Sequence, residues 1–227
     1  ASKHDIGVDL VIGLSFSPLK RSLCEEFGAR LVGLDLLHQG LQPKAVIAEY
    51  LEKHGAAYFF TDQFANAANV DAHILETGPE IVEQIKDEML RFSGISLVLG
   101  AGTGAHASAL HTVLSQEFRD LEVILVEPEN CSFLSNVFGT HSQQGAAVGV
   151  MPPFLDLSTV HRIVSVRDID AFEGQRQLAR DAGIYPGPTG GANYFLASIV
   201  ANDQPERLVV TMTYDAGEGY LSQRISA

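Results

Sequence analysis

Cysteine, basic residues and long apolar runs are all scarce in this sequence, and each scarcity excludes a class of protein. The two cysteines, Cys24 and Cys131, lack the close spacing of a zinc site, so we expect two reduced thiols and no metal. No run of about 18 apolar residues is present that would span a membrane. The 15 basic and 28 acidic residues give a net charge of -13, which disfavours nucleic acid and anionic lipid as partners. With no secretory signal pattern at the start, the expected compartment is cytoplasmic.

Strand-like and helix-like segments alternate along the 227 residues, and this pattern predicts an α/β fold. Parallel strands need crossover connections, so we expect parallel sheets flanked by helices. The expected strands are 29–36, 56–60, 95–100, 121–129, 161–166 and 206–213. The expected helices are 17–28, 43–55, 79–92, 104–118, 168–183 and 190–203.

The stretch "SLVLGAGTGAHASAL", residues 96–110, places a glycine-rich turn between a strand and a helix. Three interpretations fit it. The glycines give a sharp corner, or Gly100, Gly102 and Ala105 form a dinucleotide fingerprint with Glu127 on the ribose. In the third, the helix N-terminus holds a phosphate monoester. The turn alone does not separate these interpretations.

Two other segments have no place in a dinucleotide fold that starts at residue 95. One is "GPTGGANY", residues 187–194, a second glycine-rich turn that opens a helix. The other is residues 61–85, a polar stretch rich in Asn, Gln and Gly between an expected strand and an expected helix.

Six ordered motifs resemble the cysteine synthase and cystathionine β-synthase family, pyridoxal phosphate enzymes of fold type II with the tryptophan-synthase-like fold. They are "DQFANAANVDAHILETGPEIVEQI", "GAGTGAH", "VEPENCSFL", "QQGAAVGVMP", "LARDAGIYPGPTGGA" and "DAGEGYLS". The resemblance runs from about residue 7 to the end. It implies a smaller mobile N-terminal domain, of which residues 1–60 are a remnant, and a larger cofactor-binding domain, residues 61–227. The rest of the N-terminal part is expected to be missing from the sequence or disordered.

The resemblance also implies a cofactor, pyridoxal 5'-phosphate, and the residues that bind it. Its phosphate is expected on Gly102, Thr103, Gly104, Ala105 and His106. At two of these positions the chain departs from the family, because Ala105 replaces a glycine and His106 replaces a threonine. His106 is then either a substitute phosphate donor or a surface histidine.

Further site residues follow from the same resemblance. Thr189 takes the place of the serine that bonds the pyridine nitrogen, and a neutral hydroxyl there favours elimination of a β-substituent. Gln63 is expected to bind the substrate carboxylate, and Asp215 and Ala216 to lie near the cofactor ring. The alternative for Thr189 is a helix cap.

The Schiff-base lysine of the family has no clear counterpart, because its motif is not intact in this chain. The five lysines are Lys3, Lys20, Lys44, Lys53 and Lys86. Only Lys3 lies upstream of the other motifs, so it is the candidate catalytic lysine.

The resemblance predicts β-elimination and β-replacement on an activated serine, such as O-acetylserine or O-phosphoserine. The product is cysteine or a related β-substituted alanine, the substrate is a small amino acid, and the family predicts a homodimer. Two alternatives stay open: a catalytically silent family member that binds a partner, and an NAD-dependent oxidoreductase.

Overall fold

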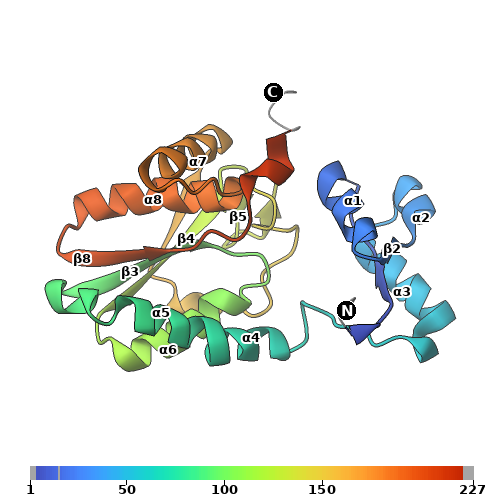
Figure 1. Ribbon diagram of the computed structural model, residues 1–227, viewed down its shortest axis with the longest axis horizontal. Helices are drawn as coiled ribbons and strands as arrows, with labels where there is room; N and C mark the ends of the chain where they lie inside the picture. The colour runs from blue at the N-terminus through green and yellow to red at the C-terminus, as the bar shows by residue number, and fades with distance from the viewer. Residues whose placement is uncertain (1–3, 15, 222–227) are drawn as a thin grey trace. The chain divides into compact units, whose positions relative to one another are not determined.

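The computed structural model describes residues 4–14 and 16–221, which fall into two compact units that meet in sequence at Thr61 and Asp62. In the first unit, two short parallel strands are accompanied by three helices (Figure 1). The elements are β1 (Val8–Leu10), α1 (Pro18–Glu26), β2 (Ala29–Leu31), α2 (Leu34–His38), α3 (Pro43–His54) and the 3-10 turn η2 (Gly55–Ala57). The functional division into a mobile and a cofactor-binding domain stays a prediction.

The second unit is built on a four-stranded parallel sheet in the order β7-β4-β3-β8. Its strands are β3 (Gly94–Gly100), β4 (Leu121–Pro128), β7 (Arg162–Val166) and β8 (Arg207–Thr211), with a small antiparallel pair, β5 (Cys131–Ser132) and β6 (Val137–Phe138). Its helices are α4 (Ala68–Ala72), the π-helix η3 (His73–Thr77), α5 (Gly78–Ile85), α6 (Ala105–Glu117), α7 (Asp168–Ala182) and α8 (Pro188–Asp203). Three short 3-10 turns complete it, η4 (Glu88–Arg91), η5 (Leu157–Thr159) and η6 (Gly217–Tyr220).

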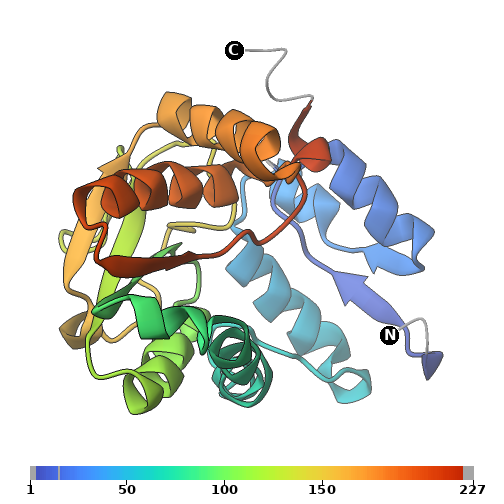
Figure 2. The ribbon, with the colours of Figure 1, turned by 60° about the vertical axis from the view of Figure 1, so that its left-hand side comes forward.

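Helices cover both faces of this sheet, with α7 and α8 on one side and α5 and α6 on the other (Figures 1 and 2). The alternation of side chains along β3 explains the arrangement. Leu97 and Leu99 lie in the buried cluster that includes α5 and α6, whereas Val98 between them lies in the cluster of α7 and α8. All seven residues of β3 are buried, as expected for a central parallel strand.

Helices α7 and α8 approach each other closely through glycines. A Cβ at Gly174 of α7 would come well under 3.0 Å from the Gly191 carbonyl oxygen of α8. A Cβ at Gly191 would collide in the same way with the Ala171 carbonyl oxygen of α7. The pair therefore packs backbone against backbone, which fixes α8 and its first turn relative to the sheet.

Two strand predictions in the first unit were wrong. The run 29–36 is a strand only as far as Leu31, because Gly33 has a φ of 70° and opens the short helix α2. The run 56–60 is not a strand, and the side chain of Phe59 is 82% exposed. The expected helix 79–92 also divides, since α5 ends at Ile85 and the 3-10 turn η4 follows.

A charged cluster inside the first unit joins β1, β2 and the end of α3. The Asp9 carboxylate accepts two hydrogen bonds from Arg30, at 2.8 and 2.7 Å, and one each from Tyr50 and Tyr58, at 2.6 and 2.7 Å. Its side chain is only 7% exposed, whereas that of Arg30 is 68% exposed. The Arg30 hydrogen bonds, more than the other contacts, hold the pKa of Asp9 well below its usual range.

Replacing this carboxylate is expected to destabilise the protein. Asp9→Asn should cost about 2 kcal/mol at neutral pH, because the guanidinium and two phenols lose a nearly buried, charged acceptor. Since the folded pKa is depressed, the stabilisation is complete above the ordinary carboxyl pKa of about 3.9 and declines as the pH falls below it. Urea unfolding at several pH values measures the difference. Asp35→Asn, at an exposed site in α2, is the control, and an equal effect of both variants would contradict the prediction.

Candidate functional site

The glycine turn after β3 forms a loop with free backbone donors at the start of α6. Strand β3 ends at Gly100, and α6 begins at Ala105 after Gly104, whose φ is 82°. Among the described residues, the N–H groups of Gly102, Thr103 and Gly104 have no hydrogen-bond acceptor. Unpartnered N–H groups at a helix N-terminus, favoured further by the helix dipole, are the donor set that suits a phosphate.

Neighbouring backbone leaves no room for side chains at two loop positions. A Cβ at Gly102 would lie far less than 3.0 Å from the Gly145 carbonyl oxygen, and one at Gly104 would lie 2.7 Å from the Leu155 nitrogen. Two backbone hydrogen bonds hold the same neighbours in place, Ala147 N–H to the Ala101 oxygen at 2.9 Å and Phe154 N–H to the Thr103 oxygen at 3.1 Å. The loop is thus a rigid cradle held by residues 145–155.

The second glycine turn lies beside the first. Thr189, in the first turn of α8, is 4% exposed, and its hydroxyl donates to the Gln144 carbonyl at 2.9 Å. Its Cγ2 lies 3.1 Å from the position that a Cβ would take at Gly100. Two turns almost ninety residues apart in sequence therefore meet at the carboxyl end of β3, the usual place for a ligand in an open α/β sheet.

Gln63 is exposed, and its main chain is joined to the phosphate loop through Asn69. The Asn69 side-chain amide donates to the Gln63 carbonyl at 2.8 Å and, more weakly, to the Thr103 hydroxyl at 3.4 Å. The Gln63 side chain thus stands on a segment tied to the loop. Asn69 had no individual role in the sequence interpretation, although it lies within one of the motifs.

Asp215 and Ala216 pack against the turn that precedes α8. The Asp215 carbonyl accepts from the Gly187 N–H at 2.8 Å, and Ala216 forms an antiparallel bridge with Pro186. The Asp215 carboxylate accepts a hydrogen bond from the Tyr220 hydroxyl. The segment around residue 215 therefore lies against the turn that leads into α8 and Thr189.

His106 does not lie on the surface as an isolated histidine. Its Nε2 is 3.0 Å from the Gly100 carbonyl oxygen and 2.9 Å from the Tyr214 hydroxyl. The rings of His106 and His73 lie edge to face, with centroids 6.0 Å apart. No sequence pattern selects Tyr214, and His73 lies within one of the six motifs but had no individual role in the sequence interpretation.

His106 is expected to stay neutral through the physiological range. Burial first, and nearby His73 second, lower the pKa of His106 to about 4. A base with a lowered pKa gains its proton only on stronger acidification, so no change of the ring should occur between about pH 5.5 and 8. Nitrogen-15 NMR of the histidine rings measures this directly. A midpoint near the ordinary histidine value of about 6.5 would show the prediction to be wrong.

The candidate catalytic lysine, Lys3, lies outside the described residues. Lys53 and Lys86 form ion pairs with Glu49 and Glu83 on their own helical segments. Glu127, the ribose ligand of the NAD alternative, accepts the Phe133 N–H at 2.9 Å and so stabilises its own loop.

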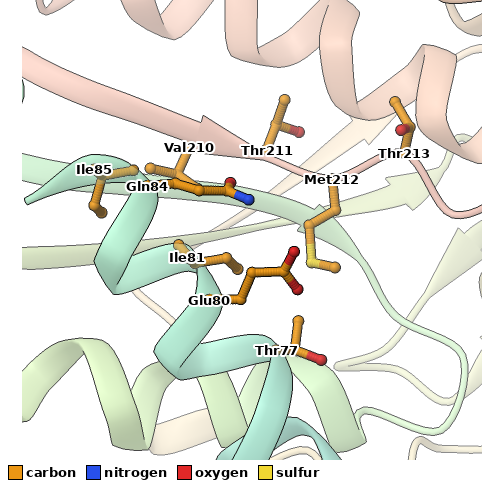
Figure 3. Close-up of a pocket in the computed structure, with 9 residues that line it drawn as sticks. All are labelled: Thr77, Glu80, Ile81, Gln84, Ile85, Val210, Thr211, Met212 and Thr213. Atoms are coloured by element: carbon orange, nitrogen blue, oxygen red, sulfur yellow. The ribbon is translucent and has the colours of Figure 1, made fainter.

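A pocket of about 250 Å³ lies between α5 and the edge strand β8. Figure 3 shows Glu80 and Gln84 of α5 directed toward Met212 and Val210. Thr77, which also lines the pocket, has its hydroxyl 2.9 Å from Nδ1 of His73. The lining mixes a carboxylate and an amide with hydroxyl and apolar groups, so its chemistry selects no one class of ligand.

Both cysteines are free thiols, Cys131 buried and Cys24 partly so. Across residues 4–14 and 16–221, no helix combines the length and apolarity needed to cross a bilayer. In the same ranges, no three potential metal ligands of the His, Cys, Asp and Glu types cluster together.

The parallel sheet, the loop of free N–H groups and the adjoining turn of α8 define an α/β protein with a phosphate-type cradle at the carboxyl ends of its strands. Comparison with known proteins makes the class specific. The chain belongs to the family described as "Pyridoxal-phosphate dependent enzyme", which it matches over residues 1–214. The predicted family is confirmed, and pyridoxal phosphate is the cofactor of that family.

Individual relatives agree with this membership. The chain is 33% identical over 213 residues to "Cysteine synthase" of Staphylococcus aureus, covering 92% of this chain and 66% of the relative. It is 30% identical over 226 residues to "Cysteine synthase B" of Campylobacter jejuni, covering 98% and 73%. The chain thus spans about two thirds of the length of the curated relatives it matches.

The solved structures give the same result for the fold. An O-ureido-L-serine synthase superimposes with a TM-score of 0.81 at 29% identity, covering 94% of this chain and 66% of that one. A hydrogen sulfide-producing enzyme from Fusobacterium nucleatum has a TM-score of 0.81 at 25% identity, with 97% and 73% covered. The predicted fold class, parallel sheet flanked by helices in a fold-type II enzyme, is confirmed.

Proposed function

We propose that this chain holds pyridoxal phosphate at the corner between α6 and α8 and contributes to a cysteine-synthase-like reaction on an activated serine. The observation that supports this most strongly is the set of unpartnered N–H groups of Gly102, Thr103 and Gly104, with buried Thr189 beside the same strand. The residues present fit the cofactor. The cradle supplies donors for a dianion, and Thr189 supplies a neutral polar partner for the ring.

Each residue of the corner has one task in this proposal. The backbone of residues 102–106 binds the phosphate, and Thr189 turns its hydroxyl from the Gln144 carbonyl to the ring nitrogen when the cofactor is bound. Gln63 donates its amide protons to the substrate carboxylate. When bound, the cofactor supplies an electron sink for the Cα carbanion of the amino acid. A neutral hydroxyl at the ring nitrogen limits how strongly the ring withdraws electrons, and this favours loss of a leaving group at Cβ.

The finer parts of the proposal concern substrate and assembly. We propose O-acetylserine or O-phosphoserine as the activated serine and sulfide as the nucleophile, and the similarity to two cysteine synthases supports this choice. Lys3 is the proposed base and Schiff-base residue. We propose a cytoplasmic homodimer in which residues 1–60 belong to a mobile substrate-covering domain and residues 61–227 to the cofactor domain.

Binding of the cofactor is expected to depend on its phosphate. Pyridoxal phosphate should bind at least about a hundredfold more tightly than pyridoxal, because the cradle N–H groups gain charge-assisted hydrogen bonds only with the phosphate. Fluorescence or absorbance titration of the purified protein measures both affinities. Equal affinities, or tight binding of NADH instead, would contradict the proposal.

Turnover is tested on the loaded protein with sulfide and either O-acetylserine or O-phosphoserine, and cysteine formation is followed by mass spectrometry. Thr189→Ser should retain activity, whereas Thr189→Ala should lose about tenfold or more, because only serine preserves the hydroxyl. Cofactor binding with no turnover of either activated serine would support the silent alternative and contradict the proposed reaction.

A further inference from the structure

His106 and Tyr214 converge on one backbone atom at the end of β3. The Gly100 carbonyl oxygen is 3.0 Å from His106 Nε2 and 2.9 Å from the Tyr214 hydroxyl. The two side chains also contact each other, with 2.9 Å between Nε2 and the hydroxyl and 5.2 Å between ring centroids in an edge-to-face arrangement. His106 stands in the first turn of α6, and Tyr214 follows β8, so they approach Gly100 from different elements.

The short distances among His106 Nε2, the Tyr214 hydroxyl and the Gly100 oxygen determine which ring nitrogen of His106 carries the proton. A carbonyl oxygen only accepts hydrogen bonds, so Nε2 at 3.0 Å must carry a hydrogen, because two lone pairs would otherwise face each other. Tyr214 then donates its own proton to the Gly100 oxygen, and desolvation raises the pKa of Tyr214, which keeps it a phenol. The arrangement is fully satisfied by a neutral Nε2–H imidazole. Its Nε2–H is therefore already engaged and not aimed at a ligand on the loop.

We propose that His106 and Tyr214 are positioning residues that fasten the phosphate loop to the segment after β8 and so set the distance between the two ends of the cofactor site. This rests on the proposed function. In this proposal the His106 side chain does not contact the phosphate directly. It instead links the phosphate loop, from behind, to the segment that contains Tyr214. Phosphate affinity then depends on backbone N–H groups held in place by that tie.

The segment fastened in this way reaches the other end of the site. Asn193 of α8, fully buried, donates its side-chain amide to the Met212 carbonyl at 3.0 Å. The Asp215 carbonyl accepts the Gly187 N–H at 2.8 Å, immediately before α8. Tyr214 therefore lies between two attachments to the helix that presents Thr189. One continuous path of contacts joins the phosphate loop to the turn for the ring nitrogen.

The groups facing the pair do not add charge to it. His73 packs edge to face on the His106 ring, and burial lowers the pKa of His73 as well. The remaining partners are the Gly100 carbonyl and the Asn193 side chain, which faces the Tyr214 hydroxyl. The tie is consequently a set of neutral hydrogen bonds.

The test compares pyridoxamine 5'-phosphate with pyridoxamine, a pair of probes that form no Schiff base with lysine and differ only by the phosphate. His106→Ala and Tyr214→Phe should each lower the affinity for pyridoxamine 5'-phosphate by about tenfold, because each removes one hydrogen bond behind the loop. The affinity for pyridoxamine should change by less than about twofold. His106→Gln should recover most of the affinity, since its amide nitrogen can reproduce the Nε2–H donor. The double variant should lose less than the product of the single losses, as expected for coupled groups.

His111→Gln is the matched control on the same helix and should leave both affinities unchanged. Circular dichroism checks folding, and Tyr214→Phe, which removes one oxygen atom, remains informative if His106→Ala unfolds. Equal loss for both probes, no loss for either, or failure of His106→Gln to recover affinity would overturn the positioning role. If the unaltered protein does not prefer the phosphorylated probe, the proposed function itself fails, and the two failures are thereby distinguished.

Discussion

Gly102→Ala is expected to abolish phosphate-dependent cofactor binding while leaving the protein folded. The added methyl group would collide with the Gly145 carbonyl oxygen, which is main chain and has no rotamer to change. The loop must then move, and its N–H groups move with it. A displacement of about 1 Å in a binding constellation can cost on the order of a hundredfold, so we expect at least that loss for pyridoxal phosphate.

The loss should be confined to the phosphate. Titration with pyridoxal phosphate, with pyridoxal as the non-phosphorylated comparison, should show the affinity of the variant falling to the level of pyridoxal. Gly7→Ala is the control, because a Cβ there meets nothing within 4 Å. Near-normal affinity for pyridoxal phosphate in Gly102→Ala would mean that the loop does not hold the phosphate.

Gly174→Ala should destabilise the protein by about 2 kcal/mol, although alanine is the better helix former by about 1 kcal/mol. In α7 the new Cβ would collide with the Gly191 carbonyl oxygen and lie 2.9 Å from Cβ of Phe195. Helices α7 and α8 must therefore separate, and the first turn of α8 moves with them. Urea denaturation measures the change in the free energy of unfolding.

Gly55→Ala is a suitable control for this second prediction. Gly55 has right-handed backbone angles, and a Cβ there would meet only Leu51 at 3.8 Å, an ordinary contact distance. That variant should be neutral or slightly stabilising. A neutral result for Gly174→Ala would show that the two helices can separate at little cost, and would contradict the close packing described for them.

The sequence predicted the central sheet well because its strands are buried on both faces. The strands at 95–100 and 121–129 were found within about two residues, since a short continuous apolar run is typical of a parallel strand covered by helices on both sides. In the first unit the same rule failed. At 29–36, the left-handed Gly33 divides one apolar run into a strand and a helix, and at 56–60 the aromatic run remains largely exposed. Short elements depend on such local geometry more than on hydropathy.

The candidate site was predictable where motifs existed and hidden where contacts are tertiary. The loop 102–106 and Thr189 were identified from motifs, and in the structure both lie at the end of β3. Tyr214 lies more than a hundred residues from His106 in sequence, so no spacing rule links them. Asn69 and His73 are similar cases, because their partners come from other elements.

The Gly100 carbonyl, which His106 and Tyr214 share, also affects which substitutions the sequence can accept during evolution. Its oxygen accepts from two side chains, so a substitution at residue 106 alone leaves Tyr214 with one contact fewer. Residues 106 and 214 should consequently behave as an epistatic pair. A threonine at one of these positions should be tolerated only when the residue at the other position is replaced as well. A deep mutational scan that varies both positions together would reveal this as correlated acceptance of residue types.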